Sequence, residues 1–356
     1  MDSIGWLKII FLFIIDITAL IGNFLILFAG IKMKKLRKLQ NAFIFNMAAA
    51  DFLQALIIIP SAFISIYNSK WGFGFKSCQA FAIMKLTITL TSVFSLAGIS
   101  LQRYFFVVKR TYRLNTKKSA ACGITIVWIV SLFFSLTPLF KWGELGFEPG
   151  KEVCTVLFQK SKSHTITIAL FGLLFNIVIM VVCYLLIFKK LYHSDVSRKL
   201  TVAKSLEQTD CSSAKNIILN EKYSLDPFDP RYYNKIECQS PSSLSFSEDH
   251  PKSCLMSKKM LQKTLNSSLS VDINIKELQL LKTISIVVIT FICCWVPYCV
   301  FNILRTLKIV GNIDLVDTIT MWLGFLNSAL NPLIYGVFNN QFKRSMVYHF
   351  PCHKIK

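Results

Sequence analysis

Long runs of apolar residues, separated by shorter polar stretches, set the pattern of this chain. A helix rises about 1.5 Å per residue, so about 20 apolar residues are needed to cross the roughly 30 Å hydrocarbon core of a bilayer. Runs of that length lie at 7-31, 41-67, 77-102, 119-140, 163-188, 278-307 and 313-336. The pattern therefore predicts an all-α membrane protein, built as a bundle of seven transmembrane helices.

The polar stretches divide the chain into five segments. These are a short N-terminal segment 1-6, helices one to five over 7-188, a long cytoplasmic third loop 189-277, helices six and seven over 278-336, and a C-terminal segment 337-356. The loop shows little apolar periodicity, so most of it is expected to be disordered. Its serine-rich part is either a set of phosphorylation sites or only a solvated linker, and the sequence leaves both open. In the last segment, the amphipathic stretch 342-350 predicts a short eighth helix on the membrane surface, with Cys352 as a palmitoylation candidate.

The distribution of charge sets the orientation of the bundle. The chain carries a net charge of +21, yet only 17% of its residues are charged and 30 are Phe, which argues against a nucleic-acid binder. Directly after the first span come Lys32, Lys34, Lys35, Arg37 and Lys38, with no acidic residue among them. By the positive-inside rule the N-terminus lies outside the cell, and the basic segments face the anionic lipids of the inner leaflet.

Two of the 11 cysteines are placed to form a disulfide. Most of the others lie within spans or in predicted cytosolic segments, which are not oxidising. Cys78, at the outer end of the third span, and Cys154, in the loop between the fourth and fifth spans, both face outside. A bridge between them would hold that loop across the mouth of the bundle.

Charged side chains within a membrane are expensive to bury and therefore indicate function. The most informative is Asp51 in the second span. Polar residues expected to converge with it are Asn23, Ser92, Asn327, Ser328 and Asn331. One carboxylate among neutral oxygens suits Na⁺, with Asp51 and Ser92 as the expected ligands. A water-filled hydrogen-bond network around a neutral Asp51 accounts for the same residues equally well.

Lys85 in the third span is the second informative charge. It lies seven residues inside Cys78, about two helical turns, so we favour an ionic role over a side chain that extends outward to water. Its partner would be a carboxylate or phosphate of a ligand, or one of the acids Glu148 and Glu152 in the loop above.

Taken together, the residues resemble those of a class A (rhodopsin-like) G-protein-coupled receptor along all seven spans. The motifs are Gly22-Asn23, Asn46 with Asp51, Gln102-Arg103-Tyr104, Trp128, Tyr184, Phe291-x-x-Cys294-Trp295-x-Pro297 and Asn331-Pro332-x-x-Tyr335. No single motif is specific, but seven in order are. The resemblance implies a receptor in the plasma membrane that carries a signal to heterotrimeric G proteins, with arrestin and receptor kinases as further partners.

The resemblance also assigns the residues that switch such a receptor. They are Arg103, Glu277, Tyr184, Phe291, Trp295, Pro297, Pro332 and Tyr335. Arg103 would hold the inner face closed through an ion pair with Glu277 and then engage the G protein. The chain departs from the family pattern at Gln102, where an acid is usual, and this loss of a negative charge predicts raised basal signalling. It departs again at Asn176, where a proline is usual, and this predicts the loss of a local helical bulge.

The resemblance restricts the ligand as well. Lys85 occupies the place of the aspartate that binds the ligand in amine receptors, so a monoamine is not expected. Phe325 stands where animal opsins carry their Schiff-base lysine, which argues against linked retinal. The predicted wall of the ligand pocket is Lys85, Thr89, Tyr298, Asn302, Met321, Trp322 and Phe325. The expected ligand is a small molecule, anionic or lipid-like.

There are three alternatives to a ligand-activated receptor, two of them from other classes of protein. A constitutively active or ligand-independent receptor would keep the fold without the ligand. A seven-helix ion or proton carrier would use Asp16, Asp51 and Lys85 as relay groups, but neither inverted repeats nor a chain of carboxylates is present in the sequence. An enzyme is not expected, because the sequence contains no Ser/His/Asp set, metal-ligand cluster or phosphate-binding loop.

Overall fold

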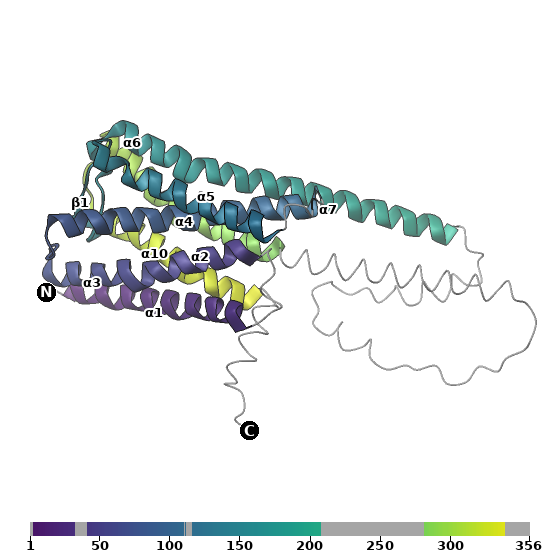
Figure 1. Ribbon diagram of the computed structural model, residues 1–356, viewed down its shortest axis with the longest axis horizontal. Coiled ribbons are helices and arrows are strands. Elements are labelled where there is room, and N and C mark those ends of the chain that lie inside the picture. Colours follow the sequence, from purple (N-terminus) through teal and green to yellow (C-terminus); the bar gives the residue numbers. More distant parts are fainter. Residues whose placement is uncertain (1–2, 33–40, 110, 112–115, 208–280, 339–356) are drawn as a thin grey trace, which may run out of the picture. The chain divides into compact units, whose positions relative to one another are not determined.

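The computed structural model describes residues 3-32, 41-109, 111, 116-207 and 281-338. The chain forms two units, one of residues 1-188 together with 276-356 and one of residues 189-275. The first unit is a bundle of long helices with one small β-hairpin (Figure 1). In the second unit the described residues are 189-207, which are helical.

The helices coincide with the seven predicted spans, with ends displaced by a few residues. They are α1 (Ser3–Lys32), α2 (Ala42–Leu53) followed by α3 (Ile59–Asn68), α4 (Phe75–Val107), α5 (Lys117–Leu136), α6 (Lys162–Thr167) followed by α7 (Phe175–Glu207), the helix Leu281–Thr306, and α10 (Asp314–Phe338). Six of these segments are long and apolar enough to cross a membrane. The seventh, α10, has polar residues in its middle, but its 25 residues exceed the length of about 20 that a span needs.

The helix of the fifth span extends past the predicted end of that span. The third loop was expected to begin at residue 189, but α7 continues to Glu207. Residues 189-207 are polar enough to end the apolar run, yet they contain no Pro or Gly that would end a helix. Residues 208-277, the predicted eighth helix and Cys352 lie outside the described residues.

Two helices contain a wider, π-helical turn. In the second span this turn is η2 (Gln54–Ile58), directly before Pro60 in the first turn of α3. In the fifth span it is η7 (Ile168–Leu174), between α6 and α7. An extra residue in a turn frees backbone carbonyls and re-aims the side chains that follow, and such turns are frequent at functional sites.

Polar side chains tie the helices together at the centre of the bundle, where α4 packs against both α2 and α5. The Asn46 amide of α2 donates to Ser95 Oγ of α4 at 2.8 Å and accepts from Trp128 Nε1 of α5 at 2.9 Å. Because lipid is as apolar as any side chain, such interhelical hydrogen bonds and close packing replace the hydrophobic effect as the source of association.

Close packing is most evident between α1 and α10, which lie side by side in Figure 1. A Cβ atom on Gly22 would lie 2.5 Å from Cγ of Pro332. Glycine is therefore required here, because it lets α1 approach the part of α10 that contains the proline. Large apolar side chains such as Phe133 and Leu185 are exposed instead, and Asp51 is buried. This distribution fits a bundle whose solvent is lipid.

Candidate functional site

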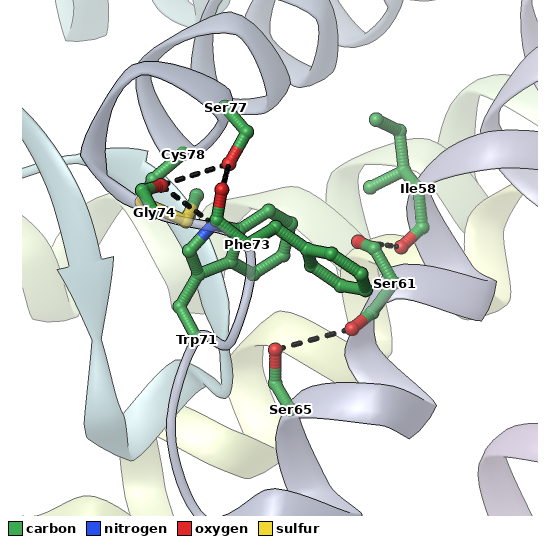
Figure 2. Close-up of a disulfide and its surroundings, with 9 residues drawn as sticks. Ile58, Ser61, Ser65, Trp71, Phe73, Gly74, Ser77 and Cys78 are labelled. Atoms are coloured by element: carbon green, nitrogen blue, oxygen red, sulfur yellow. Dashed lines mark hydrogen bonds between the residues drawn. A yellow bond between two sulfur atoms is a disulfide. The ribbon is translucent and has the colours of Figure 1, made fainter.

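A β-hairpin forms a lid at the outer end of α4. Its strands β1 (Leu145–Glu148) and β2 (Val153–Val156) are antiparallel, with Phe147 opposite Cys154, and the turn η5 (Pro149–Lys151) joins them. The predicted disulfide between Cys78 and Cys154 is confirmed, with the two Cα atoms 5.3 Å apart. Figure 2 shows the turn that leads into α4, where Trp71 Nε1 donates to the Gly74 carbonyl at 3.1 Å and to Ser77 Oγ at 3.0 Å. The disulfide therefore attaches the lid to the N-terminus of α4, which these hydrogen bonds hold in place.

A cavity of about 70 Å³ lies among the lid, α4, the fifth span and the helix Leu281–Thr306. Its polar lining residues include Lys85, Thr89, Thr155, Thr165, Tyr298 and Asn302, while the rest of the wall is mostly apolar. Trp295 also lines it. Four predicted wall residues, Lys85, Thr89, Tyr298 and Asn302, therefore surround one cavity.

The other three predicted wall residues do not line this cavity. Met321 and Phe325 are buried in the helix packing of α10, and Trp322 stacks on Phe11 of α1 with 5.4 Å between ring centroids. The turn of the lid reaches α10 one turn before Met321, through a hydrogen bond of 2.7 Å from Thr318 Oγ1 to the Gly150 carbonyl. Lys151 then extends to Asn302 on the cavity wall, with Nζ 2.7 Å from Oδ1. The turn of the lid thus contacts both α10 and the cavity wall.

Lys85 is buried, so the reading in which its side chain extends outward to water is wrong. Its ammonium donates to Thr155 Oγ1 of β2 at 3.0 Å and lies 6.0 Å from the centre of the Tyr298 ring. The expected acidic partners are engaged elsewhere: Glu148 pairs with Arg305 and Lys151, and Glu152 pairs with Lys8. No carboxylate among the described residues forms an ion pair with Lys85.

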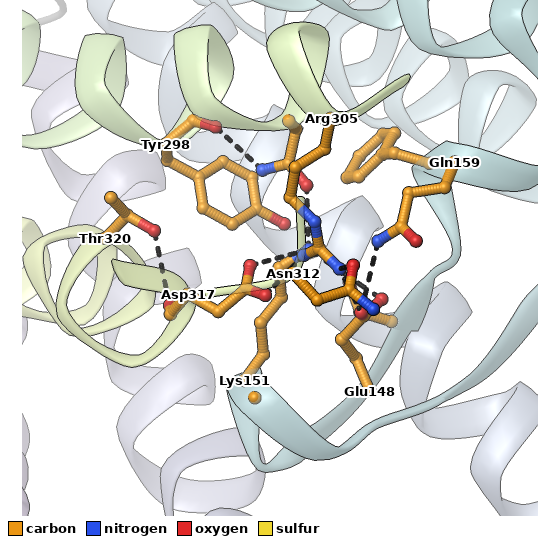
Figure 3. A network of polar contacts seen from close by, with 12 residues as sticks. Glu148, Lys151, Gln159, Tyr298, Arg305, Asn312, Asp317 and Thr320 are labelled. Atoms are coloured by element: carbon orange, nitrogen blue, oxygen red, sulfur yellow. Dashed lines mark hydrogen bonds and ion pairs between the residues drawn. The ribbon is translucent and has the colours of Figure 1, made fainter. Parts of the chain in front are cut away.

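Four buried charges form what we call the lid ion cluster: Glu148, Lys151, Arg305 and Asp317 (Figure 3). Arg305 pairs with Asp317 and, at 3.2 Å, with Glu148 Oε1. Lys151 Nζ lies 3.7 Å from Asp317 Oδ1 and 3.9 Å from Glu148 Oε2. The cluster therefore joins the lid to the outer ends of the helix Leu281–Thr306 and α10.

Two charged groups of the lid have displaced pKa values. Burial lowers the pKa of Lys151 from its ordinary value of 10.5, against the opposing attraction of Glu148 and Asp317. Burial raises the pKa of Glu152, and this effect is opposed by Lys8 of α1, whose Nζ lies 2.5 Å from the carboxylate. The pair with Lys8 ties the lid to a fourth helix.

The predicted polar network around Asp51 is assembled in the middle of the bundle. Oδ1 of Asp51 accepts from Ser92 Oγ and from Ser328 Oγ, each at 3.0 Å, and Oδ2 accepts from Asn331 Nδ2 at 2.8 Å. Asn23 joins indirectly, by donating to the Ser328 carbonyl at 3.0 Å. Asn327 is buried, but its Oδ1 has no hydrogen-bond partner among the described residues. Three of the five predicted companions thus bind the carboxylate directly.

The residues assigned to switching lie on four helices, and one of them, Trp295, lines the cavity. Arg103, Tyr184 and Tyr335 are buried on α4, α7 and α10, and Phe291, Trp295 and Pro297 lie on the helix Leu281–Thr306. Trp295 is positioned by α10, where a Cβ on Gly324 would come within 3.0 Å of the indole ring. Glu277 lies outside the described residues, so its ion pair with Arg103 stays a prediction.

Comparison with known proteins decides what this arrangement is. The sequence model of the family "7 transmembrane receptor (rhodopsin family)" matches residues 22–335. The chain belongs to that family.

Similar proteins include an octopamine receptor beta-2R of Chilo suppressalis, 26% identical over 96% of this chain and 78% of that one. The 5-hydroxytryptamine receptor 1F of Homo sapiens is 28% identical over 91% of this chain and 87% of its own length, and melanopsin-A of Gadus morhua is 35% identical over 50% and 33%. In structure, the chain resembles squid rhodopsin with a TM-score of 0.69 at 20% identity, covering 99% of this chain and 86% of that one. The protein is therefore a G-protein-coupled receptor that spans the membrane several times, and the carrier and enzyme alternatives are set aside.

In the receptor, the expected loss of the bulge in the fifth span is wrong. The π-helical turn η7 is present directly before α7. Asn176 takes up the carbonyls of this turn, because its Nδ2 donates to Phe171 at 2.9 Å and to Gly172 at 3.1 Å. An amide side chain thus stabilises a wide turn without a proline.

The lid ion cluster of the receptor was not predicted from the sequence. Arg305 and Asp317 fall within the predicted spans 278-307 and 313-336, and a short connection separates them. Opposite charges at facing ends of consecutive spans indicate a pair, so this signal was present. Lys151 gave no such signal, because a lysine in a loop is ordinarily exposed.

Proposed function

We propose that this receptor responds to a small ligand other than an amine, bound in the cavity beneath the lid. Lys85 carries the proposal: it is buried on the cavity wall, and the resemblance matches its position to that of the aspartate in amine receptors. A protonated amine there would face a second buried cation without an intervening carboxylate, which is unfavourable at low dielectric. The relatives include receptors named for octopamine and 5-hydroxytryptamine. Under this proposal, members of the same family bind different classes of ligand.

The proposed location is the plasma membrane with the N-terminus outside. The asymmetry of basic residues supports this orientation. The disulfide of the lid supports it as well, because such bonds persist on the oxidising side of a membrane. The inner face would then carry Arg103 to the G protein, and arrestin and receptor kinases would act there on the open state.

We also propose that Asp51 binds Na⁺. Two hydroxyls and one amide surround the carboxylate of Asp51. Asn327, the residue before Ser328 in the chain, has a buried Oδ1 with no hydrogen-bond partner among the described residues. A hydroxyl oxygen retains lone pairs for a cation when its hydrogen turns away, so the donor set fits a small hard ion. Bound Na⁺ would balance the negative charge of the buried carboxylate.

A second candidate, signalling without a ligand, is favoured by one observation. Gln102 replaces the acid next to the buried Arg103, so the closed state loses a negative charge beside the arginine. Replacing Gln102 with Asp should then lower G-protein activation in the absence of any added ligand, at equal surface expression. Equal basal activity in the two proteins would remove this candidate.

The ligand proposal is tested by G-protein dissociation in cells that express the receptor, with biogenic amines compared against acidic and neutral small molecules. We expect no response to amines, while a 5-hydroxytryptamine receptor in the same cells responds. A response must vanish in Arg103→Ala to be assigned to this receptor. An amine response that persists in Lys85→Met would refute the proposal.

A further inference from the structure

The five buried charges at the lid do not balance. Lys85, Lys151 and Arg305 are cations, Glu148 and Asp317 are anions, and all five are buried. The two carboxylates are committed to Lys151 and Arg305 through the contacts of the lid ion cluster. The cation left without a carboxylate is Lys85, whose Nζ bonds to a hydroxyl, and an anion beside it would hold it in its charged form.

A buried ammonium with only a neutral partner is unfavourable, because the low-dielectric interior does not replace the water that it has lost. The second lysine increases the cost, since Lys151 Nζ lies 5.3 Å from the centre of the same Tyr298 ring that Lys85 approaches at 6.0 Å. One negative charge placed at Lys85 would bring the sum of the buried charges to zero. A dianion would instead leave the buried groups with a net negative charge.

The shape and lining of the cavity limit the remainder of the ligand. Away from Lys85 the walls are apolar, with Leu90, Val93, Ile168 and Leu173 among them. The volume of about 70 Å³ is roughly half of the ~150 Å³ of an engineered apolar cavity that binds benzene. The space therefore takes a headgroup and a short apolar tail.

Hydroxyls beside Lys85 complete the headgroup site. Thr155 and Thr89 both line the cavity, and Thr155 Oγ1 already accepts from Lys85. Thr155 also forms a hydrogen bond with the hydroxyl of Tyr298, so Thr89 supplies the hydroxyl for an acceptor. A carboxylate, which has two acceptor oxygens and no donor, can take one hydrogen bond from the ammonium and another from a threonine.

We infer that the ligand of this receptor is a small monocarboxylate with a short apolar tail, whose carboxylate binds Lys85. This inference rests on the proposed function and names the chemical class that the same site accepts. Neutral amides and alcohols of equal length would fill the same space, but they would leave the positive charge on Lys85 unpaired.

Thermal unfolding of the purified receptor in lipid nanodiscs tests this inference without reference to signalling. The probes are straight-chain carboxylates from acetate to octanoate, each with its amide and its amine. We expect stabilisation by the carboxylates alone, with an optimum at about two to five carbons given the volume. In Lys85→Met, the concentration needed for half of the effect should rise about 10- to 100-fold.

Controls separate the inference from the proposal that it rests on. Lys70→Met removes an exposed lysine and should bind carboxylates as the unaltered receptor does. Lys85→Glu should reverse the preference, so that the amines stabilise and the carboxylates do not. Equal stabilisation by carboxylate and amide, or unchanged affinity in Lys85→Met, would overturn the anion site while leaving a non-amine receptor intact. Stabilisation of the unaltered receptor by the amines alone would refute both.

Discussion

Asp317 offers the sharpest test of the lid ion cluster. Its side chain is 1% exposed, and it faces both Arg305, with which it pairs, and Lys151, whose Nζ lies 3.7 Å away. In Asp317→Asn the charge is lost while the shape is kept, so two buried cations share the single carboxylate of Glu148. Removing one partner of a buried pair costs about 3 to 5 kcal/mol. Because the new amide oxygen still accepts a hydrogen bond from Arg305, we expect the lower end, about 3 kcal/mol.

A loss of about 3 kcal/mol lowers the midpoint of thermal unfolding by roughly 5 °C or more in a chain of this size. The measurement is thermal unfolding of the purified receptor in nanodiscs at one fixed scan rate, because unfolding of such proteins is often irreversible. The matched control is Asp314→Asn, which removes an exposed carboxylate one turn earlier on α10 and should change the midpoint little.

The double variant Arg305→Met with Asp317→Leu distinguishes a charge effect from simple disruption. It removes both members of the pair and leaves Lys151 facing Glu148, so stability should return to within about 1 kcal/mol of the original. If the double variant were as unstable as the sum of its two single changes, the reasoning from buried charge would be refuted.

Three further predictions concern other parts of the receptor. Asn176→Leu removes two hydrogen bonds to the carbonyls of the π-helical turn and should lower the stability of the receptor by about 1 to 3 kcal/mol. Asn176→Pro should retain more surface expression than Asn176→Leu, because proline has no backbone N–H that must find an acceptor in the wide turn. Equal surface expression of the two variants would contradict this role of Asn176. Because burial lowers the pKa of Lys151, the unfolded chain holds a proton that the folded chain has released at pH values between the lowered pKa and 10.5. Thermal stability should therefore rise with pH in that interval, and Lys151→Met should remove the rise; a slope unaltered in this variant would exclude Lys151 as its source. Sodium chloride in place of choline chloride should raise the unfolding midpoint of the receptor but not of Asp51→Asn, and an equal rise in both would count against the cation site.

The positions of the helices could be predicted from the sequence because hydrophobic length is a strong local signal. All seven spans and the disulfide were obtained in this way, and so was the contact of Asp51 with three of its expected companions. In each case the composition of one segment, or the depth of a residue within it, was sufficient.

Features that depend on the lid could not be obtained in this way. The partner of Lys85 is Thr155, which nothing in the local sequence distinguishes from other threonines, and the acids expected to pair with it are engaged elsewhere. Phe325, Met321 and Trp322 were placed on the cavity wall from the resemblance to the receptor family, which carries no information on the turn of the lid that reaches α10. The turn at Asn176 was misjudged because proline was taken as its only cause, although a side-chain amide can satisfy the same carbonyls.

Several contacts fasten the lid: the disulfide attaches it to α4, Lys8 to α1, and Arg305 and Asp317 to the outer ends of the helix Leu281–Thr306 and of α10. A ligand that reaches the cavity from outside must wait for several of these contacts to open together. The time for which a ligand stays bound is then set by the lid as much as by its affinity. We therefore expect association slower than about 10⁵ M⁻¹s⁻¹, and a long residence time even for a weak ligand.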